Sequence, residues 1–437
     1  MPPTKSTAGS RALHWVLKIG NLRTSMNFFE KVLGLKVLRH EEFETGCEAT
    51  CNGRYAGAWS KTMIGFGPEK ENFALELTYN YGIDSYKFGN DLQYICLQLD
   101  VESTKAKAVA EGCFSFDDLP STGGGGVLIH GPDNYNYKVV PLIAGREERF
   151  LSVGIHVEDL PRSIAYWCDL LGMSQFPSEP PVAPGSEGAV PNPAEARTRV
   201  AVGFAPEQVK LDLLQLGEGA VEHALSSGRV AFACGPVAPI HEAVSQAGGT
   251  VLTPPLTLPT PGKADVEVTI LADPDGYEIC FVGASAFYEL ATPTYDVIDF
   301  AARAPRGGDG APPPKASALE HSAAIGAAST PEDVAKALEE VGPKGLVMLD
   351  FGAGWCKNCK RLLPTVESIA TTNAGKVMVL AVDVDEAEDL ADEHGVTGVP
   401  HFVVLQGGGE GDKVGEYRGS VEAELEAVVA SALELME

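Results

Sequence analysis

Long apolar runs are missing from this sequence. No uninterrupted stretch approaches the roughly 20 residues that a membrane-spanning helix needs, and residues 1–10 contain no secretory h-region. We therefore expect no membrane partner and a cytoplasmic location. Two basic residues near the start, Lys5 and Arg11, are too few to identify a transit peptide and do not decide between cytosol and organelle. A mitochondrial or plastid location therefore stays open as an alternative.

Positive charge is scarce as well. The 437 residues include 33 Lys and Arg against 60 Asp and Glu, which gives a net charge of −27 at pH 7. An acidic surface repels phosphate backbones and anionic lipid headgroups. We therefore expect no nucleic acid partner, and we interpret the acidity as solvation of exposed faces.

The cysteines show no even-numbered disulfide framework. There are nine, spread along the chain, and with no secretory signal this is typical of a reducing compartment with mostly free thiols. Cys47 and Cys51 are close in sequence and are either a redox pair or, as we expect, two separate thiols. Cys356 and Cys359 differ from the other cysteines because the sequence around them predicts a strand before the pair and a helix after it.

The second pair lies in residues 351–360, which read FGAGWCKNCK. The apolar run 345–351 predicts a strand buried on both faces of a parallel sheet, and apolar residues at helical spacing between 362 and 370 predict a helix. Cys356 should then begin that helix, where unpaired backbone N–H groups favour a thiolate. The two thiols can close a disulfide and exchange electrons with a partner's disulfide.

Roughly the last hundred residues, about the size of one small domain, resemble thioredoxin. The resemblance depends on Asp350, Trp355–Lys360, Pro364 and Gly398–Pro400. One departure is the pair Lys357–Asn358, where thioredoxins usually have Gly-Pro. The residues between the cysteines tune the redox potential, so the direction of electron flow stays open.

The thioredoxin resemblance implies a set of roles. Cys356 is the attacking thiol and Cys359 the resolving thiol, while Asp350 is a buried carboxylate that moves a proton to or from Cys359. Pro400 is a cis-proline beside the disulfide, and Trp355 and Val399 contact the substrate. The implied partners are protein disulfide substrates or a thioredoxin reductase-type donor, and the dithiol requires no cofactor.

A structural zinc site is the alternative for the cysteine pair. Structural zinc normally has four ligands, and the neighbourhood has no second pair of cysteines. The nearest imidazoles are His394 and His401. His401 precedes the apolar run 402–405, so we interpret it as a strand residue.

An internal repeat occupies the chain ahead of this region. Residues 21–35 return as 159–173 and residues 65–69 return as 203–207, both at an offset of 138. Later, 131–135 corresponds to 273–277. Each copy reads as two strand-helix-strand modules, which gives four modules in all.

The repeats resemble the vicinal oxygen chelate superfamily of glyoxalase I and bleomycin-resistance proteins, and within it the glyoxalase domain-containing protein 4 family, over about residues 10–290. The similar stretches are 11–14, 38–44, 59–63, 76–82 and 270–276. The implied fold class is α+β, with tandem βαβββ modules followed by an α/β thioredoxin fold. The predicted domains are 10–145, 148–290 and 321–437, with a Pro- and Gly-rich linker at 291–320.

The superfamily resemblance also implies a divalent metal, Zn or Ni, held by ligands from paired modules. His14 and Glu76 match the two ligands of the first module. In the other modules, most of the residues at the ligand positions differ from the family's ligands. These residues are Tyr94 and Lys138 in the second module, Ser152 and Asp212 in the third, and Arg229 and Cys280 in the fourth. Cations such as Lys138 and Arg229 repel a divalent ion. Alternatively, His14 and Glu76 face a cavity and bond to each other or to water.

From these observations we expect a thiol-disulfide oxidoreductase joined to a tandem that binds a small molecule, such as a glutathione derivative, or a protein. One alternative is a metal-dependent lyase of the glyoxalase type that acts on a glutathione hemithioacetal. Another is a scaffold in which both folds only bind.

Overall fold

The computed structural model describes a defined set of residues: 7, 9–47, 50–55, 57–111, 115–119, 125–177, 199–258, 265–298, 324–354, 356–409 and 411–436. Most of the predicted linker lies outside this set, as does Trp355. Within these ranges, no helix is both long enough and apolar enough to cross a bilayer.

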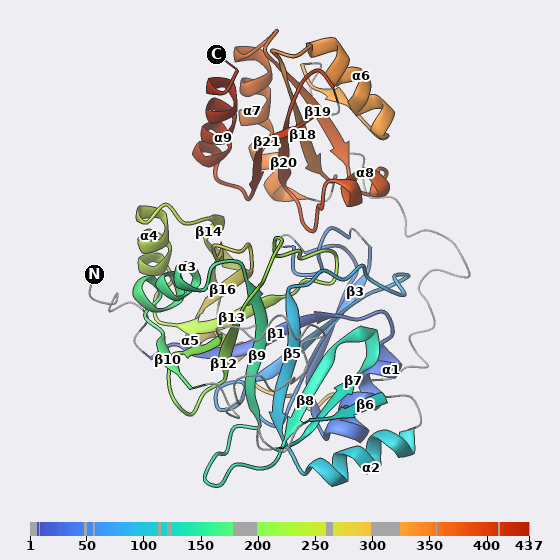
Figure 1. The fold of residues 1–437 in the computed structure, drawn as a ribbon, viewed down its shortest axis with the longest axis vertical. Coiled ribbons are helices and arrows are strands. Elements are labelled where there is room, and N and C mark those ends of the chain that lie inside the picture. Colours follow the sequence, from blue (N-terminus) through green and yellow to red (C-terminus); the bar gives the residue numbers. More distant parts are fainter. Residues whose placement is uncertain are drawn as a thin grey trace.

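The first of two large sheets joins strands from opposite ends of the repeat region (Figure 1). Its strands are β1 (Arg11–Lys18), β2 (Lys36–Phe43), β3 (Trp59–Gly65), β4 (Ala74–Asn80), β13 (Arg229–Cys234), β14 (Val251–Leu258), β15 (Val266–Ala272) and β16 (Glu278–Gly283). Their order is β14-β15-β16-β13-β1-β4-β3-β2. The first and fourth modules therefore meet where β1 pairs antiparallel with β13.

The second large sheet joins the two middle modules. Its strands are β5 (Leu92–Gln98), β6 (Ser115–Asp118), β7 (Val127–His130), β8 (Asn136–Val140), β9 (Phe150–Val157), β10 (Ser174–Phe176), β11 (Arg199–Gly203) and β12 (Lys210–Gln215). Their order is β10-β11-β12-β9-β5-β8-β7-β6. Each repeat thus supplies one module to each sheet. The tandem βαβββ fold is confirmed, while the boundaries at 145 and 148 stay predictions.

The helices of the tandem follow the same repeat. They are α1 (Leu22–Asn27), η2 (Phe28–Leu33), α2 (Val101–Glu111), η4 (Pro132–Asn134), α3 (Leu160–Ile164), η5 (Ala165–Leu170), α4 (Ala238–Gln246) and α5 (Ala284–Leu290). The segment η2, which continues α1, is a π-helix, and η5 continues α3 in the same way. Phe28 and Phe29 are both buried there, with ring centroids 4.9 and 5.6 Å from that of Tyr137. The wider π-helical turn accommodates both neighbouring rings on the core side.

Near the end of each repeat, a carboxylate accepts hydrogen bonds from the start of another module; Asp133 is half-buried and Asp275 is buried. In the first repeat, Asp133 accepts hydrogen bonds from the Gly20 backbone N–H at 2.8 Å and the Ser25 hydroxyl at 3.2 Å. In the second, Asp275 accepts them from the backbone N–H of Glu158 at 3.2 Å and the hydroxyl of Ser163 at 2.8 Å. The repeat is therefore present in the hydrogen bonds as well as in the sequence.

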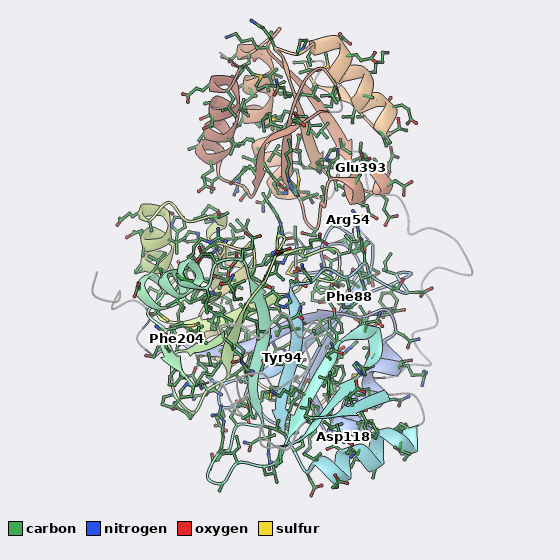
Figure 2. All side chains as sticks on the ribbon, in the orientation of Figure 1. Arg54, Phe88, Tyr94, Asp118, Phe204 and Glu393 are labelled. Atoms are coloured by element: carbon green, nitrogen blue, oxygen red, sulfur yellow. A yellow bond between two sulfur atoms is a disulfide. The ribbon has the colours of Figure 1, made fainter. Side chains whose placement is uncertain are left out.

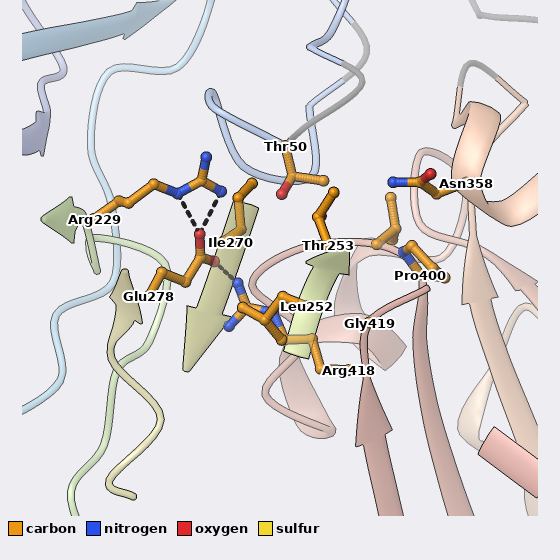
Figure 3. Close-up of a pocket in the computed structure, with 11 residues that line it drawn as sticks. Thr50, Arg229, Leu252, Thr253, Ile270, Glu278, Asn358, Pro400, Arg418 and Gly419 are labelled. Carbon is orange, nitrogen blue, oxygen red and sulfur yellow. Dashed lines mark hydrogen bonds and ion pairs between the residues drawn. The ribbon is translucent and has the colours of Figure 1, made fainter. Parts of the chain in front are cut away.

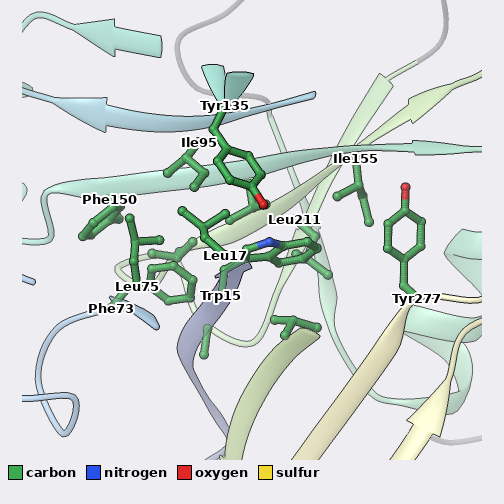
Figure 4. Packing of buried hydrophobic residues seen from close by; sticks show 14 of the residues in the cluster. Trp15, Leu17, Phe73, Leu75, Ile95, Tyr135, Phe150, Ile155, Leu211 and Tyr277 are labelled. Atoms are coloured by element: carbon green, nitrogen blue, oxygen red, sulfur yellow. The ribbon is translucent and has the colours of Figure 1, made fainter. Parts of the chain in front are cut away.

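The main core lies between the two large sheets (Figure 4). Trp15 and Leu17 of β1 point into it and meet Ile155 and Leu211 of the other sheet. Fully burying one such side chain contributes about 1.5–3 kcal/mol. Side chains alternate along a strand, so His14 of β1 lies on the opposite face, which carries the candidate metal positions.

The C-terminal part is a five-stranded sheet covered by helices on both faces (Figure 1). Its elements are β17 (Gly326–Ala327), α6 (Pro331–Val341), β18 (Leu346–Gly352), α7 (Lys357–Thr372), β19 (Val377–Asp383), α8 (Glu388–Glu393), β20 (His401–Gln406), β21 (Lys413–Arg418) and α9 (Glu422–Glu434). The order β17-β19-β18-β20-β21 makes β18 central. The helix α6 starts at a reciprocal capping box formed by Thr330 and Asp333.

Arg54 joins the C-terminal part to the tandem. Its side chain is 2% exposed and pairs with Asp392 at 2.6 Å and with Glu388 at 3.3 Å. It also donates a hydrogen bond to the Val396 carbonyl at 3.3 Å. Figure 2 shows Arg54 at the edge of the tandem that faces the C-terminal part. The two parts are thus held by a buried guanidinium with acidic partners on α8.

Candidate redox site and the altered metal positions

Cys356 and Cys359 form a disulfide at the start of α7. Cys356 is the N-cap residue of this helix, and its Sγ accepts a hydrogen bond from the backbone N–H of Cys359 at 3.0 Å. Both cysteines are buried, with exposed fractions of 2% and 9%. The helix terminus and this N–H favour negative charge on Cys356 once the disulfide opens.

Asp350 lies on β18, the strand that leads into this helix. Burial raises the pKa of its carboxyl group to about 7. A carboxyl group with that pKa exists in both protonation states at neutral pH, so it can accept or donate a proton. Its predicted role toward Cys359 stays a prediction.

The residues that flank the disulfide border the tandem. The Val399–Pro400 peptide bond is cis. Asn358, Val399 and Pro400 line one side of a cavity of about 20 Å³, and Thr50 lines the other. In Figure 3 the Asn358 side chain points toward Thr50. The position predicted to contact substrate at Val399 is therefore covered by the protein's own tandem.

His401 has a structural partner. It begins β20, as the sequence indicates, and its Nε2 lies 2.8 Å from Oε1 of Glu416. Burial acts to raise the pKa of Glu416, but the hydrogen bonds and charges of His401 and Lys413 outweigh it and lower the pKa to about 2. Within the described residues, no cluster of three or more His, Cys, Asp or Glu side chains suits a metal ion. Nothing there supports the zinc alternative.

His14 and Glu76 come together on the face of the first sheet away from the core. His14 Nε2 lies 3.6 Å from Oε2 of Glu76, while its Nδ1 lies 2.7 Å from Oε1 of Glu69. Glu69 in turn pairs with Arg39 at 2.5 Å. Arg39 thus supplies the counter-charge for the Glu69 carboxylate, which lies beside His14.

The fourth module adds Arg229 and Cys280 to this group. Arg229 is held by an ion pair with Glu278, and it acts electrostatically on Glu76 and Cys280. Burial raises the pKa of the Cys280 thiol to about 11, so at neutral pH it is a protonated and poor metal ligand. A guanidinium occupies the place of a metal ligand, and the residues present do not fit a divalent metal.

At the matching positions of the second sheet, polar side chains gather around Asp212. Asp212 is fully buried and accepts hydrogen bonds from the Tyr94 hydroxyl at 3.0 Å and the Ser152 hydroxyl at 2.7 Å. Arg199 pairs with the same oxygen at 3.0 Å. Lys138 lies 5.5 Å from the centre of the Tyr94 ring. All three contacts converge on Oδ2 of Asp212, while its Oδ1 is buried without a hydrogen-bond partner among the described residues. The cations Arg199 and Lys138 beside this carboxylate oppose a divalent ion.

The expectation of two separate thiols at Cys47 and Cys51 is wrong, because the structure joins them in a disulfide. Their spacing was the only signal in the sequence. A turn brings them together, since the Thr50 N–H donates to the Cys47 carbonyl at 2.8 Å. The Arg54 contacts were also missed, because its partners lie more than 330 residues further along the chain.

Comparisons with known proteins agree with this architecture. Residues 190–290 match the family model described as glyoxalase domain-containing protein 4-like, C-terminal domain, and residues 328–431 match the thioredoxin model. Glyoxalase domain-containing protein 4 of Mus musculus is 41% identical over 293 residues, which cover 65% of this chain and 89% of that protein. Glyoxalase 1 of Caenorhabditis briggsae is 41% identical over 64% of this chain and 91% of that protein.

A mutant glyoxalase I from Zea mays has a similar structure, with a TM-score of 0.52 and 26% identity over 65% of this chain and 95% of that chain. Fold and site thus define a vicinal oxygen chelate tandem of the glyoxalase type joined to a thioredoxin domain. The chain belongs to the glyoxalase domain-containing protein 4 family. The thioredoxin domain is an addition to the matched region.

Proposed function

We propose that this protein is a thiol-disulfide oxidoreductase whose active centre is the Cys356–Cys359 pair. The observation that carries the proposal is the position of Cys356 at the N-cap of α7, where its sulfur accepts the Cys359 N–H. A redox pair at a helix N-terminus has its attacking sulfur stabilised as a thiolate.

The reaction takes two exchange steps. The Cys356 thiolate attacks one sulfur of a protein disulfide, a mixed disulfide forms, and the other substrate sulfur leaves as a thiolate that takes up a proton. Cys359 then gives its proton to the Asp350 carboxylate and attacks Cys356, which releases the second substrate sulfur. Asp350 suits this task because burial raises its pKa to about 7.

A dithiol donor, such as a thioredoxin reductase-type partner, returns the oxidised pair to the dithiol. No cofactor is needed at the pair itself, because both electrons stay on sulfur. The predicted contacts of Trp355 and Val399 with substrate, and the cytoplasmic location, stay predictions.

For the tandem we propose binding of a small molecule or a protein partner. The lyase alternative needs a metal at His14 and Glu76, but Arg39 and Arg229 supply positive charge to the carboxylates there. We therefore derive no catalytic step through a metal.

Reduction of insulin by the full chain with dithiothreitol tests the proposed activity. The wild type should accelerate precipitation of the insulin B chain, and Cys356→Ser should return the rate to that of dithiothreitol alone. Cys168→Ser is the matched control, because Cys168 is a partly exposed free thiol elsewhere in the chain. A wild type no faster than dithiothreitol alone would contradict the proposal.

A further inference from the structure

The loop that carries the Cys47–Cys51 disulfide packs against the active-site loop of the thioredoxin domain. A Cβ built on Gly398 would lie 3.6 Å from the Thr50 hydroxyl, and one on Gly53 would lie 3.6 Å from the Thr397 carbonyl oxygen. Thr50 directly precedes Cys51. The cavity that remains beside Pro400 measures about 20 Å³, room for about one water molecule.

A second cavity adjoins the first and brings Cys51 into the same contact. Cys51 and Thr397 line it, and both cavities share the lining residues Thr50, Arg229, Glu278 and Arg418. Asn358, between the two active-site cysteines, lines the first cavity. Cys51 and Asn358, the residue just before Cys359, therefore line two cavities that share four lining residues.

The charges around Cys51 suit a leaving thiolate. Arg229 and Arg418 both pair with Glu278, so two guanidinium groups share one carboxylate. Lys18 also lines the cavity with Cys51, and burial lowers its pKa to about 7, so only part of the population carries this charge at neutral pH. Nearby cations stabilise a thiolate and so speed its departure from a disulfide.

We propose that Cys47–Cys51 is a second redox site of this chain and that Cys356–Cys359 reduces it directly, within one molecule. This inference depends on the proposed oxidoreductase activity and names a substrate of it. The packing of Thr50 and Gly53 against residues 397–400 is the observation that carries it.

The electrons and atoms balance over two exchanges. The Cys356 thiolate attacks Cys51, so the Cys356–Cys51 bond forms, the Cys47–Cys51 bond breaks, and Cys47 leaves as a thiolate that takes up a proton. Cys359 then loses its proton and attacks Cys356, and Cys51 leaves as the second thiolate. The tandem disulfide gains two electrons, the active-site dithiol loses two, and a dithiol donor restores it.

Timed alkylation and mass spectrometry of the full chain test the relay. Oxidised wild type is exposed to dithiothreitol, quenched with acid and alkylated, and the redox state of each pair is read from its peptides. Cys47–Cys51 should open at least tenfold faster in the wild type than in Cys356→Ser. Its half-time should not change on tenfold dilution of the protein, because the transfer is intramolecular.

Two variants sharpen the test. Cys359→Ser, alkylated under native conditions so that Cys47 cannot attack back, should accumulate a Cys356–Cys51 cross-linked peptide. Arg54→Ala should slow the opening of Cys47–Cys51 several-fold without slowing insulin reduction, because Arg54 joins the domains and lies outside the cysteine pair. Cys168→Ser, the matched control, should change neither rate.

Equal opening rates in the wild type and Cys356→Ser, with insulin reduction intact in the wild type, would overturn the relay and leave the oxidoreductase standing. A half-time that lengthens on dilution would also overturn it. Failure of the wild type to reduce insulin would instead contradict the oxidoreductase activity itself.

Discussion

Asp350 is an ionisable residue on β18, the strand that leads into the active-site helix. Burial disfavours its ionised form and raises its pKa to about 7, whereas in the unfolded chain the pKa is about 4. Between pH 4 and pH 7 the folded state holds this proton and the unfolded state does not. The free energy of unfolding therefore falls as the pH rises through this window, and the loss is complete above pH 7.

Asp350→Asn should abolish the decrease in the free energy of unfolding between pH 4 and pH 7, because the amide does not ionise. We expect the variant to be more stable than the wild type at pH 8 by on the order of 2 to 4 kcal/mol, with the difference shrinking toward zero near pH 4. Urea denaturation of the oxidised chain over this pH range measures it.

The control for Asp350 is Asp412→Asn, which makes the same chemical change at an exposed position. It should leave the pH dependence as in the wild type. An Asp350→Asn chain that is no more stable than the wild type at pH 8 would show that the carboxyl group is not held against ionisation.

At the candidate metal position we expect no stoichiometric zinc or nickel. His14 and Glu76 face Arg229 and a protonated Cys280, and a guanidinium opposes a divalent ion. Metal analysis of the purified chain and of Glu76→Gln should give the same metal content. About one equivalent of metal in the wild type that Glu76→Gln removes, together with metal-dependent isomerisation of a glutathione hemithioacetal, would restore the lyase alternative.

At the scale of elements, equivalent carboxylates hold the short helix η4, which contains Asp133, and the turn before β16, which contains Asp275. Asp133 and Asp275 each accept a backbone N–H and a serine hydroxyl from another module. Removal of either carboxylate leaves buried donors without a partner, which costs about 1–3 kcal/mol.

Asp133→Ala and Asp275→Ala should therefore each lower the thermal midpoint of the tandem. Differential scanning calorimetry of the full chain measures this. Asp169→Ala, at an exposed position on η5, is the control and should leave the midpoint unchanged. A lower thermal midpoint for only one of the two variants would show that the hydrogen bonds of Asp133 and Asp275 do not contribute equally to stability.

Local elements were predictable because their signals lie within a few residues. The capping box of Thr330 and Asp333 and the apolar run before Cys356 specify α6 and β18 without any distant contact. The π-helical turn at Phe28 was not predictable from helical spacing. It depends on Tyr137, more than a hundred residues away, against which both phenylalanine rings pack.

At the scale of the whole molecule, Arg54 joins the domains. Arg54→Ala removes ion pairs with Glu388 and Asp392 and should loosen the contact. We expect small-angle X-ray scattering to show a larger radius of gyration for the variant. Arg23→Ala, on α1, is the control and should scatter as the wild type does. An unchanged profile for Arg54→Ala would mean that other contacts suffice.

Long-range pairings explain what the sequence could not reveal. The motif around Cys356 indicated the redox site, but nothing near Cys47 indicated that its loop would meet residues 397–400. Likewise, His14 matched a metal ligand, and only the pairing of β1 with β13 placed Arg229 beside it. Both outcomes depend on how distant modules meet.

Single-turnover stoichiometry tests the central claim, redox chemistry at Cys356–Cys359, most directly. A fully reduced chain, freed of reductant, is mixed with oxidised insulin, and both products are counted after alkylation. We predict about one insulin disulfide reduced for each Cys356–Cys359 disulfide formed, and none in Cys356→Ser. Insulin reduced while Cys356 and Cys359 stay as thiols, or no insulin reduced at all, would contradict the account.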